Sequence, residues 1–172
     1  MINKILVPVD GSDHSLKAAE LASDLASKYN AELVLLHVLL RGHMPEGLRK
    51  VVEIEVGSKG GRSEHLVNMP QEIMARVTDK KNTQLSLEAL DVIGKYVLGK
   101  VTQMCKDKGA KKIRQKVEEG NPAKIILTTA SDEKVDMIIM GSRGLSDLAG
   151  ILMGSVSHKV GQLARCTCVT VK

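Results

Sequence analysis

The stretch KILVPVDGSDHSLKAAELASDLASKYNAELVLLHVLL, residues 4–40, decides the fold because its hydrophobic period changes from strand to helix and back. Lys4–Val9 is a short apolar run of strand length, and Gly11–Asp13 then supplies the residue types of a turn and a helix N-cap. Apolar residues recur at helical spacing from Ala18 onward, which predicts one buried face of a helix. Ala31–Leu40 is nearly continuous hydrocarbon, as in a strand that helices cover on both faces.

The rest of the chain repeats this alternation. The predicted elements, in chain order, are a helix over Ser86–Asp107, a strand at Ile113–Val117, a helix that begins after the turn and N-cap residues Gly120–Asn121–Pro122, a strand at Met137–Met140, a helix over Val156–Ala164 and a strand at Thr167–Val171. Strands separated by helices pair in parallel through right-handed crossovers. The sequence therefore predicts an α/β fold in which an open parallel sheet lies between two layers of helices.

One stretch, Arg41–Gln84, breaks the alternation and carries prolines, glycines and mixed charges. Within it VVEIEV alternates like a strand, whereas PQEIMARV has helical spacing. We expect residues 1–172 to form a single domain, with residues 41–84 inserted after the second strand. The insertion is either a surface excursion without chemistry or a lid or interaction surface.

The composition argues against several classes of protein. A formal net charge of +5 is compatible with nucleic-acid binding, but the basic residues are scattered. The chain has no Phe, no Trp and only two Tyr, so it lacks the aromatic platforms on which single-stranded nucleic acids stack. No apolar run is long enough to cross a bilayer, and Met1–Lys4 leads directly into a strand without a leader. We expect a cytoplasmic protein that binds neither nucleic acid nor membranes.

The three cysteines are an odd number for a disulfide framework, and no Cys/His cluster has the spacing of zinc ligands. We expect Cys105, Cys166 and Cys168 to be reduced. Cys166 and Cys168 lie two apart in a predicted strand and so point to one face, either as small buried hydrophobes or as a redox or metal pair.

Two predicted strands end in residues that suit a ligand. In an open parallel sheet, ligands bind beyond the carboxyl ends of the strands, where the winding reverses. The first strand ends at Asp10 and the fourth runs into Gly141–Gly144, so a carboxylate faces a glycine-rich loop if these strands are neighbours. We expect the glycines at 141, 144 and 154 to allow positive φ angles and close approach of an anion.

The residues after this loop favour a phosphate. Gly154 and Ser155 open a helix whose unpaired N–H groups and dipole attract negative charge. Hydroxyl groups of Ser155 and Ser157 add donors, and the cations nearby in sequence are Arg143, His158 and Lys159. The segment has neither the GK[ST] ending of a Walker A loop nor a GxGxxG fingerprint.

The spacing Gly141-x2-Gly144-x9-Gly154-Ser155 resembles the nucleotide-binding signature of the universal stress protein family. The resemblance extends to KILVPVDGSDHSLKAAELA at the start of the chain, AELVLLHV in the second strand, and DMIIMGSRG and MGSVSHKV around the loop. It covers the whole chain except Arg41–Gln84, where members of the family vary. It implies five parallel strands in the order 3-2-1-4-5, an arrangement like that of the adenine nucleotide alpha hydrolases.

The resemblance also implies a ligand and its contacts. In the nucleotide-binding branch of the family, the position of Asp10 contacts ribose or adenosine and the backbone of Val38 meets adenine. The glycine segments hold ribose and triphosphate, with Mg²⁺ or Mn²⁺ bound through the phosphates rather than by protein ligands. The implied ATP-binding residues are Pro8, Val9, Asp10, Val38, Gly141, Ser142, Arg143, Gly144, Gly154, Ser155, Val156 and Ser157.

Several of these residues have an alternative role. Asp10 is also suited to a turn or cap, Val38 to the core by its side chain, and Arg143 to solvent. His37 is typical of a buried histidine with a hydrogen-bond partner, since no second titratable group lies at a spacing useful for catalysis. The last strand, Thr167–Val171, is the implied edge of a homodimer, although the Cys-Pro pair that often precedes it in the family is replaced by Cys166-Thr167.

Three functions remain open from the sequence. The first is an ATP-binding regulatory or stress-response dimer whose nucleotide occupancy changes its conformation or dimer contacts. The second is a slow metal-dependent ATPase or nucleotidyl transferase, although no nucleophile–base pair is apparent and no residue is assigned as catalytic. The third is an interaction module that binds a protein partner and no nucleotide, as in the branch of the family that lacks the full glycine loop.

Overall fold

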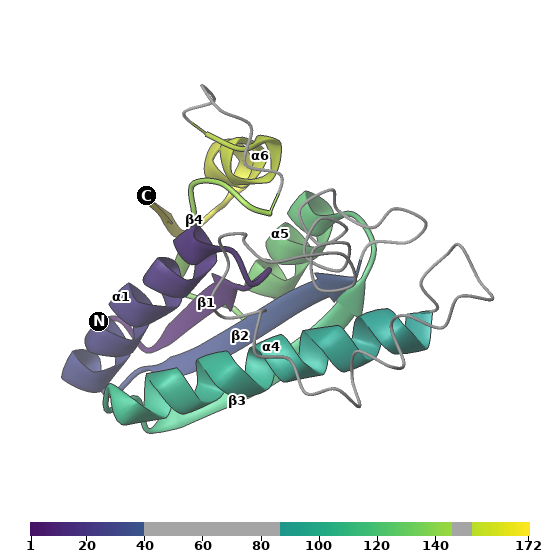
Figure 1. The fold of residues 1–172 in the computed structure, drawn as a ribbon. Helices are drawn as coiled ribbons and strands as arrows, with labels where there is room; N and C mark the ends of the chain where they lie inside the picture. Colours follow the sequence, from purple (N-terminus) through teal and green to yellow (C-terminus); the bar gives the residue numbers. More distant parts are fainter. Residues whose placement is uncertain (40–86, 146–152) are drawn as a thin grey trace.

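The computed structural model describes residues 1–39, 87–145 and 153–172. They form a parallel sheet with helices on both faces, as Figure 1 shows. The elements, in chain order, are β1 (Lys4–Pro8), α1 (Asp13–Tyr29), β2 (Glu32–Leu39), α4 (Leu87–Asp107), β3 (Lys112–Glu119), α5 (Pro122–Asp132), β4 (Met137–Gly141), α6 (Ser155–Leu163) and β5 (Thr167–Val171). The predicted insertion at residues 41–84 lies outside the described residues.

The five strands of the described chain lie in the order β3-β2-β1-β4-β5, and every pairing is parallel. The predicted fold class and strand order are therefore confirmed. β1 pairs with β2 from Lys4↔Glu32 to Pro8↔Leu36, and it pairs with β4 on its other side. The chain winds outward in opposite directions from these two central strands, so the gap between their carboxyl ends is the switch point at which such sheets bind ligands.

Local sequence signals fix the ends of the helices. Ser12 caps α1 by accepting a hydrogen bond from the N–H of Ser15, and Asn30 ends the helix in the left-handed conformation with φ 54°. Asn121 caps α5 in the same way, with Pro122 as the first helical residue. These caps are the ones that the sequence predicts.

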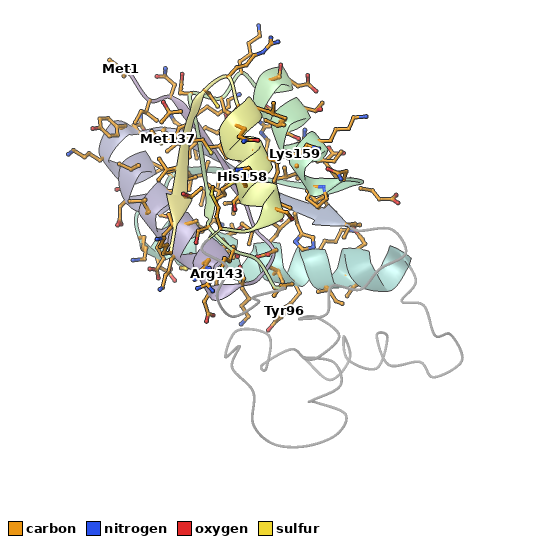
Figure 2. All side chains as sticks on the ribbon, turned by 90° about the horizontal axis from the view of Figure 1, so that it is seen from above. Met1, Tyr96, Met137, Arg143, His158 and Lys159 are labelled. Carbon is orange, nitrogen blue, oxygen red and sulfur yellow. The ribbon has the colours of Figure 1, made fainter. Side chains whose placement is uncertain are left out.

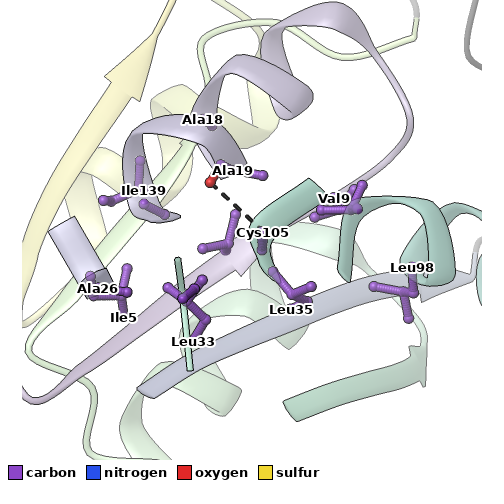
Figure 3. Packing of buried hydrophobic residues seen from close by; sticks show 14 of the residues in the cluster. Ile5, Val9, Ala18, Ala19, Ala26, Leu33, Leu35, Leu98, Cys105 and Ile139 are labelled. Atoms are coloured by element: carbon purple, nitrogen blue, oxygen red, sulfur yellow. Dashed lines mark hydrogen bonds between the residues drawn. The ribbon is translucent and has the colours of Figure 1, made fainter. Parts of the chain in front are cut away.

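The core has two halves, one on each face of the sheet. α1 and α4 cover one face, where apolar side chains of β1, β2 and β4 such as Ile5, Leu33 and Ile139 are fully buried. Figure 3 shows this half, in which the buried thiol of Cys105 approaches the carbonyl oxygen of Ala19 at 4.0 Å. α5 and α6 cover the other face, which holds Leu6, Leu36 and Ile138. The three inner strands β1, β2 and β4 are apolar in most positions, as their sequences predict.

The cysteines are all free thiols. Cys166 and Cys168 both pack against the core half beneath α5 and α6, so the prediction that they share a face is confirmed. Burial raises the pKa of both thiols. None of the helices in the described part of the chain is long and apolar enough to span a bilayer.

An ion-pair cluster closes the amino ends of the strands, opposite the switch point. Glu133 accepts hydrogen bonds from the guanidinium of Arg114 at 2.6 and 2.8 Å, and Lys4 and Lys116 each lie 3.4 Å away. Arg114 also reaches Glu32 on β2 at 3.1 Å. The hydrogen bonds from Arg114 lower the pKa of Glu133 to about 2. The cluster joins β1, β2, β3 and the end of α5.

Several predicted element boundaries differ from the structure by one or two residues, and two elements, β3 and α6, illustrate this. β3 runs from Lys112 to Glu119, three residues longer than the predicted Ile113–Val117, because it pairs with β2 along the whole length of that strand. α6 begins at Ser155, one residue before the predicted start. The second difference brings the backbone N–H of Ser155 into the first turn of the helix.

Candidate functional site

A cavity of about 230 Å³ lies at the carboxyl ends of β1, β2 and β4. The rest of its wall comes from α1, α4, α5, the first turn of α6 and the loop after β4. Its lining residues are Pro8, Val9, Asp10, Ser15, Leu36, His37, Val38, Leu39, Ile93, Pro122, Ile126, Met140, Gly141, Arg143, Gly144, Leu145, Gly154, Ser155, Val156 and Ser157. Most of these side chains are apolar, and the polar groups gather on the β1, β4 and α6 side, so the cavity suits a ligand with a flat apolar end and a charged end.

The carboxylate of Asp10 joins β1 to the loop that follows β4. Its Oδ2 atom accepts a hydrogen bond from the N–H of Leu145 at 3.1 Å. Its Oδ1 atom accepts from the N–H of Ser12 at 3.0 Å and from the Ser12 hydroxyl at 2.6 Å. The predicted approach of the carboxylate to the glycine loop is confirmed, and Asp10 also has the turn role that the sequence leaves open.

The glycines of the loop are required for close approach and not for backbone angle. Gly11, Gly109 and Gly120 are the described glycines with φ in the left-handed region, so the predicted positive φ at positions 141, 144 and 154 is wrong. A Cβ atom on Gly141 would stand 2.9 Å from the backbone of His14, and one on Gly144 would stand 2.5 Å from Asp10 Oδ2. The loop is therefore pressed against α1 and Asp10, and a side chain would not fit there.

The amino end of α6 opens into the cavity. Gly154 is its N-cap, with φ −71° and ψ 157°, and no side chain among residues 1–39, 87–145 and 153–172 caps the helix. The N–H of Gly154 and the hydroxyl of Ser157 both donate to the carbonyl oxygen of Ser142, at 2.7 and 2.6 Å. These bonds attach α6 to the end of β4. In the part of the chain that the structure describes, the N–H groups of its first turn are left for another acceptor.

The hydroxyl of Ser157 bonds within the protein, and its predicted role as a donor to a ligand stays a prediction. Its side chain is buried at 2% exposure, and its hydroxyl is bonded to the carbonyl oxygens of Ser142 and Gly154. Ser155 is exposed and lines the cavity, and its role as a donor to a ligand stays a prediction. Ser142 is buried and outside the cavity lining, and its hydroxyl has no hydrogen-bond partner among the described residues.

The whole chain, residues 1–172, matches the model of the Universal stress protein family. The protein belongs to the universal stress protein family. The curated universal stress protein YxiE of Bacillus subtilis is 35% identical to it over 175 residues, covering 100% of both chains. Both the sequence resemblance and the family assignment are thus confirmed.

Solved structures of other universal stress proteins share the fold. The protein MJ0577 of Methanocaldococcus jannaschii has a TM-score of 0.68 and 26% identity, covering 100% of this chain and 96% of its own. A universal stress protein in complex with cAMP has a TM-score of 0.61 and 21% identity, with coverage of 99% and 96%. The Archaeoglobus fulgidus protein in complex with dAMP has a TM-score of 0.59 and 18% identity, with coverage of 100% and 98%. At these lower identities the last two demonstrate the shared fold alone.

In this universal stress protein the cavity brings together eleven of the twelve residues that the resemblance implies, all except Ser142. The other two cations named from the sequence, His158 and Lys159, are exposed on α6 and lie outside the lining. Figure 2 shows both on that helix, with Arg143 near the amino end of α1. Arg143 is therefore the cation that the fold brings to the cavity.

The sequence did not identify the apolar wall of the cavity. Ile93 of α4, Ile126 of α5 and Met140 of β4 line it, and each is buried. Their helical or strand periodicity marks them only as core residues. The additional signal is position, because Ile126 lies in the first turns of α5 and Met140 at the carboxyl end of β4, so both lie at the ligand edge of the sheet.

Proposed function

We propose that this universal stress protein binds an adenine nucleotide, ATP with Mg²⁺ or Mn²⁺, in the cavity between β1 and β4, and that occupancy changes its conformation or its dimer contacts. The observation that carries the proposal is the amino end of α6, which no side chain of the described residues caps and which opens into the same cavity as the Asp10 carboxylate. Unpaired N–H groups with a helix dipole behind them favour an anion, and phosphate is the common anion of that geometry.

The residues at the charged end of the cavity fit a phosphate chain. Ser155 presents a hydroxyl at the first position of α6. Gly154, the N-cap, has no side chain, so a phosphate can approach the backbone N–H groups of the first turn. Arg143 lines the same end and supplies positive charge. In the proposed complex the metal is bound by phosphate oxygens and water, as Mg²⁺ commonly is in nucleotide sites.

The other end of the cavity fits a nucleoside. Ile93, Ile126 and Met140 form an apolar wall on which a base is shielded from water. Asp10 lies between this wall and α6, where a carboxylate accepts hydrogen bonds from ribose hydroxyl groups. The cAMP and dAMP held by the two related proteins both contain an adenine base, a sugar and a phosphate, which supports the choice of an adenine nucleotide.

The proposal includes a homodimer through β5. This strand forms the edge of the sheet and pairs only with β4 in the described chain. Its Thr167 and Thr170 are exposed, and its unpaired main-chain groups are available to a second copy of the strand. A location in the cytoplasm stays a prediction from the sequence.

The first experiment is to purify the protein without added nucleotide, denature it and identify the released small molecule by chromatography and mass spectrometry. Near-stoichiometric ATP or ADP is the expected result. If nothing is released, calorimetry with Mg-ATP decides, because the proposal still requires binding. No heat of binding would reject the nucleotide and favour an interaction module.

A substitution at Gly154 tests whether the nucleotide binds at the amino end of α6. Gly154 lines the cavity, and a Cβ atom on it would make ordinary contacts at 3.4 Å with the Ser142 carbonyl oxygen and 3.5 Å with the Ser157 hydroxyl. Gly154→Val adds two further methyl groups at the amino end of α6. We expect this variant to lose nucleotide affinity. Gly99→Ala is the control, since a Cβ there meets no atom within 4 Å. Unchanged affinity in Gly154→Val would show that ATP does not use the end of α6.

A further inference from the structure

The ladder between β1 and β2 stops before β2 ends. The N–H of Val9 donates to the carbonyl oxygen of Leu36 at 2.8 Å, and the paired register ends at Pro8↔Leu36. β2 continues to Leu39. In a parallel ladder that continued, the next bond would run from the N–H of Val38 to the carbonyl oxygen of Val9. In the described chain, a bond from the side chain of His37 to the Val9 carbonyl replaces it.

The side chain of His37 forms a hydrogen bond with the Val9 carbonyl oxygen. Its Nδ1 atom lies 2.7 Å from that oxygen, and because a carbonyl only accepts, Nδ1 carries the hydrogen and donates it. Burial lowers the pKa of His37, so the ring is neutral near pH 7 and Nδ1–H is its one donor. The histidine therefore satisfies a carbonyl that would otherwise pair with Val38.

The consequence lies in the backbone of Val38. Successive residues of a strand turn their N–H and C=O groups to opposite edges. The Leu36 carbonyl faces β1, where it accepts from Val9, and the Leu39 carbonyl faces β3, where it accepts from Gly120 at 3.1 Å. Val38 accordingly turns its N–H and C=O toward β1, at a level that β1 does not reach, and Val38 lines the cavity.

We propose that His37 is a positioning residue for the nucleobase. By bonding the Val9 carbonyl, His37 keeps the β1–β2 ladder from closing at Val38. The N–H and C=O of Val38 are then left for a base that presents an acceptor beside a donor. The N1 atom and the 6-amino group of adenine form such a pair. This inference rests on the proposed function and adds to it the reason why the backbone edge is available to the base.

Gly94 of α4 makes room for the ring. A Cβ atom at this position would stand 2.6 Å from His37 Cδ2 and 3.2 Å from Nε2. The ring thus lies directly on the α4 backbone, which fixes its orientation toward Val9. A side chain at position 94 would move the ring and should have the same effect on the ladder as removal of its donor.

The test uses two replacements of similar size. The side-chain nitrogen of an asparagine can occupy the place of the histidine Nδ1 atom, so His37→Asn keeps a donor for the Val9 carbonyl, whereas His37→Leu has none. We expect His37→Leu to weaken binding of AMP and ATP by about three- to tenfold, the usual worth of one uncharged hydrogen bond, and His37→Asn to stay within about twofold of wild type. Inorganic tripolyphosphate, which has no base, should bind equally to all three proteins.

A second readout needs no ligand. Amide hydrogen exchange by NMR should show the Val38 N–H unprotected in the wild-type protein and in His37→Asn, and protected in His37→Leu, where it becomes free to pair with Val9. Gly94→Ala should resemble His37→Leu, with Gly99→Ala as the matched helix control.

Equal AMP affinity in His37→Leu and His37→Asn would overturn the inference. So would a loss of tripolyphosphate binding in His37→Leu as large as its loss of AMP binding, because this would indicate general damage to the fold. If the wild-type protein binds no nucleotide, the proposed function fails, and the exchange of the Val38 amide still decides whether His37 holds the ladder open.

Discussion

The Oδ2 atom of Asp10 occupies the space that a side chain at Gly144 would need, since a Cβ atom there would stand 2.5 Å from it. The same oxygen accepts the N–H of Leu145 at 3.1 Å. The carboxylate therefore sets the position of the loop after β4 through both a hydrogen bond and a steric limit.

Gly144→Ala should displace Asp10 and break the bond to Leu145. We expect a loss of about 1.5 kcal/mol in the free energy of unfolding, the lower end of the range for a bond to a charged group, together with weaker nucleotide binding. Urea denaturation and calorimetry measure the two effects. Gly99→Ala, at an exposed position of α4, should instead stabilise the protein by about 0.5–1 kcal/mol. A Gly144→Ala protein as stable as the wild type would show that Asp10 does not fix the loop.

Alanine substitutions at Ser155 and Ser157 should have different effects, one on nucleotide affinity and the other on the free energy of unfolding. Ser157→Ala removes the hydroxyl that bonds the Ser142 carbonyl, and we expect it to lower the free energy of unfolding by about 1 kcal/mol. Ser155→Ala should leave stability within about 0.5 kcal/mol of wild type and weaken nucleotide binding by about tenfold. Thermal unfolding with and without Mg-ATP tests both. The reverse pattern would mean that Ser157, and not Ser155, contacts the ligand.

Glu133 should make the protein sensitive to acid. Its pKa is lowered from 4.5 to about 2 in the folded protein by the hydrogen bonds from Arg114. The unfolded chain therefore takes up this proton first, so the contribution to stability is complete above about pH 4.5 and is lost as the pH falls toward about 2. Glu133→Gln should be less stable than wild type at neutral pH and should lose less stability over that acid range. Urea midpoints across the range provide the comparison, and parallel curves for the two proteins would contradict it.

His37 should remain neutral below the pH at which an ordinary histidine is half protonated. Burial lowers its pKa from 6.5, and the charge of Asp10 opposes this effect. Asp10→Asn should therefore lower the pKa of His37 further. NMR titration of the His37 ring measures both shifts. A pKa at or above 6.5 in the wild-type protein would contradict the burial that the structure gives the ring.

A proline in β5 should test the proposed dimer. The N–H of Ser142 donates to the Val171 carbonyl, so Val171 faces β4 and the neighbouring Thr170 turns its main chain to the open edge. Thr170→Pro removes an edge donor and leaves the β4 ladder in place. Light scattering should report the mass of one chain for Thr170→Pro and of two chains for wild type and Thr170→Ala. A dimeric Thr170→Pro protein would place the interface elsewhere.

The order of elements and the helix caps could be predicted from the sequence, because periodicity and capping act within a few residues. Ser12, Asn30 and Asn121 are caps by their own chemistry. The reason for the glycines at 141 and 144 could not be predicted, since it depends on His14 and Asp10 lying opposite them in space. The use of the Ser157 hydroxyl likewise depends on the position of the Ser142 carbonyl, fifteen residues earlier in the chain.

β2 extends past the end of β1. The last β2 residue paired with β1 is Leu36, opposite Pro8, and β2 continues to Leu39. The overhang is main chain, and its hydrogen-bonding groups are the same whatever side chain stands at position 38. Any residue that favours a strand and matches valine in size should therefore preserve them. If a base binds to this main chain, its hydrogen bonds should tolerate substitution of the side chain at position 38 and should be sensitive to substitution of residues that shape the overhang, such as His37.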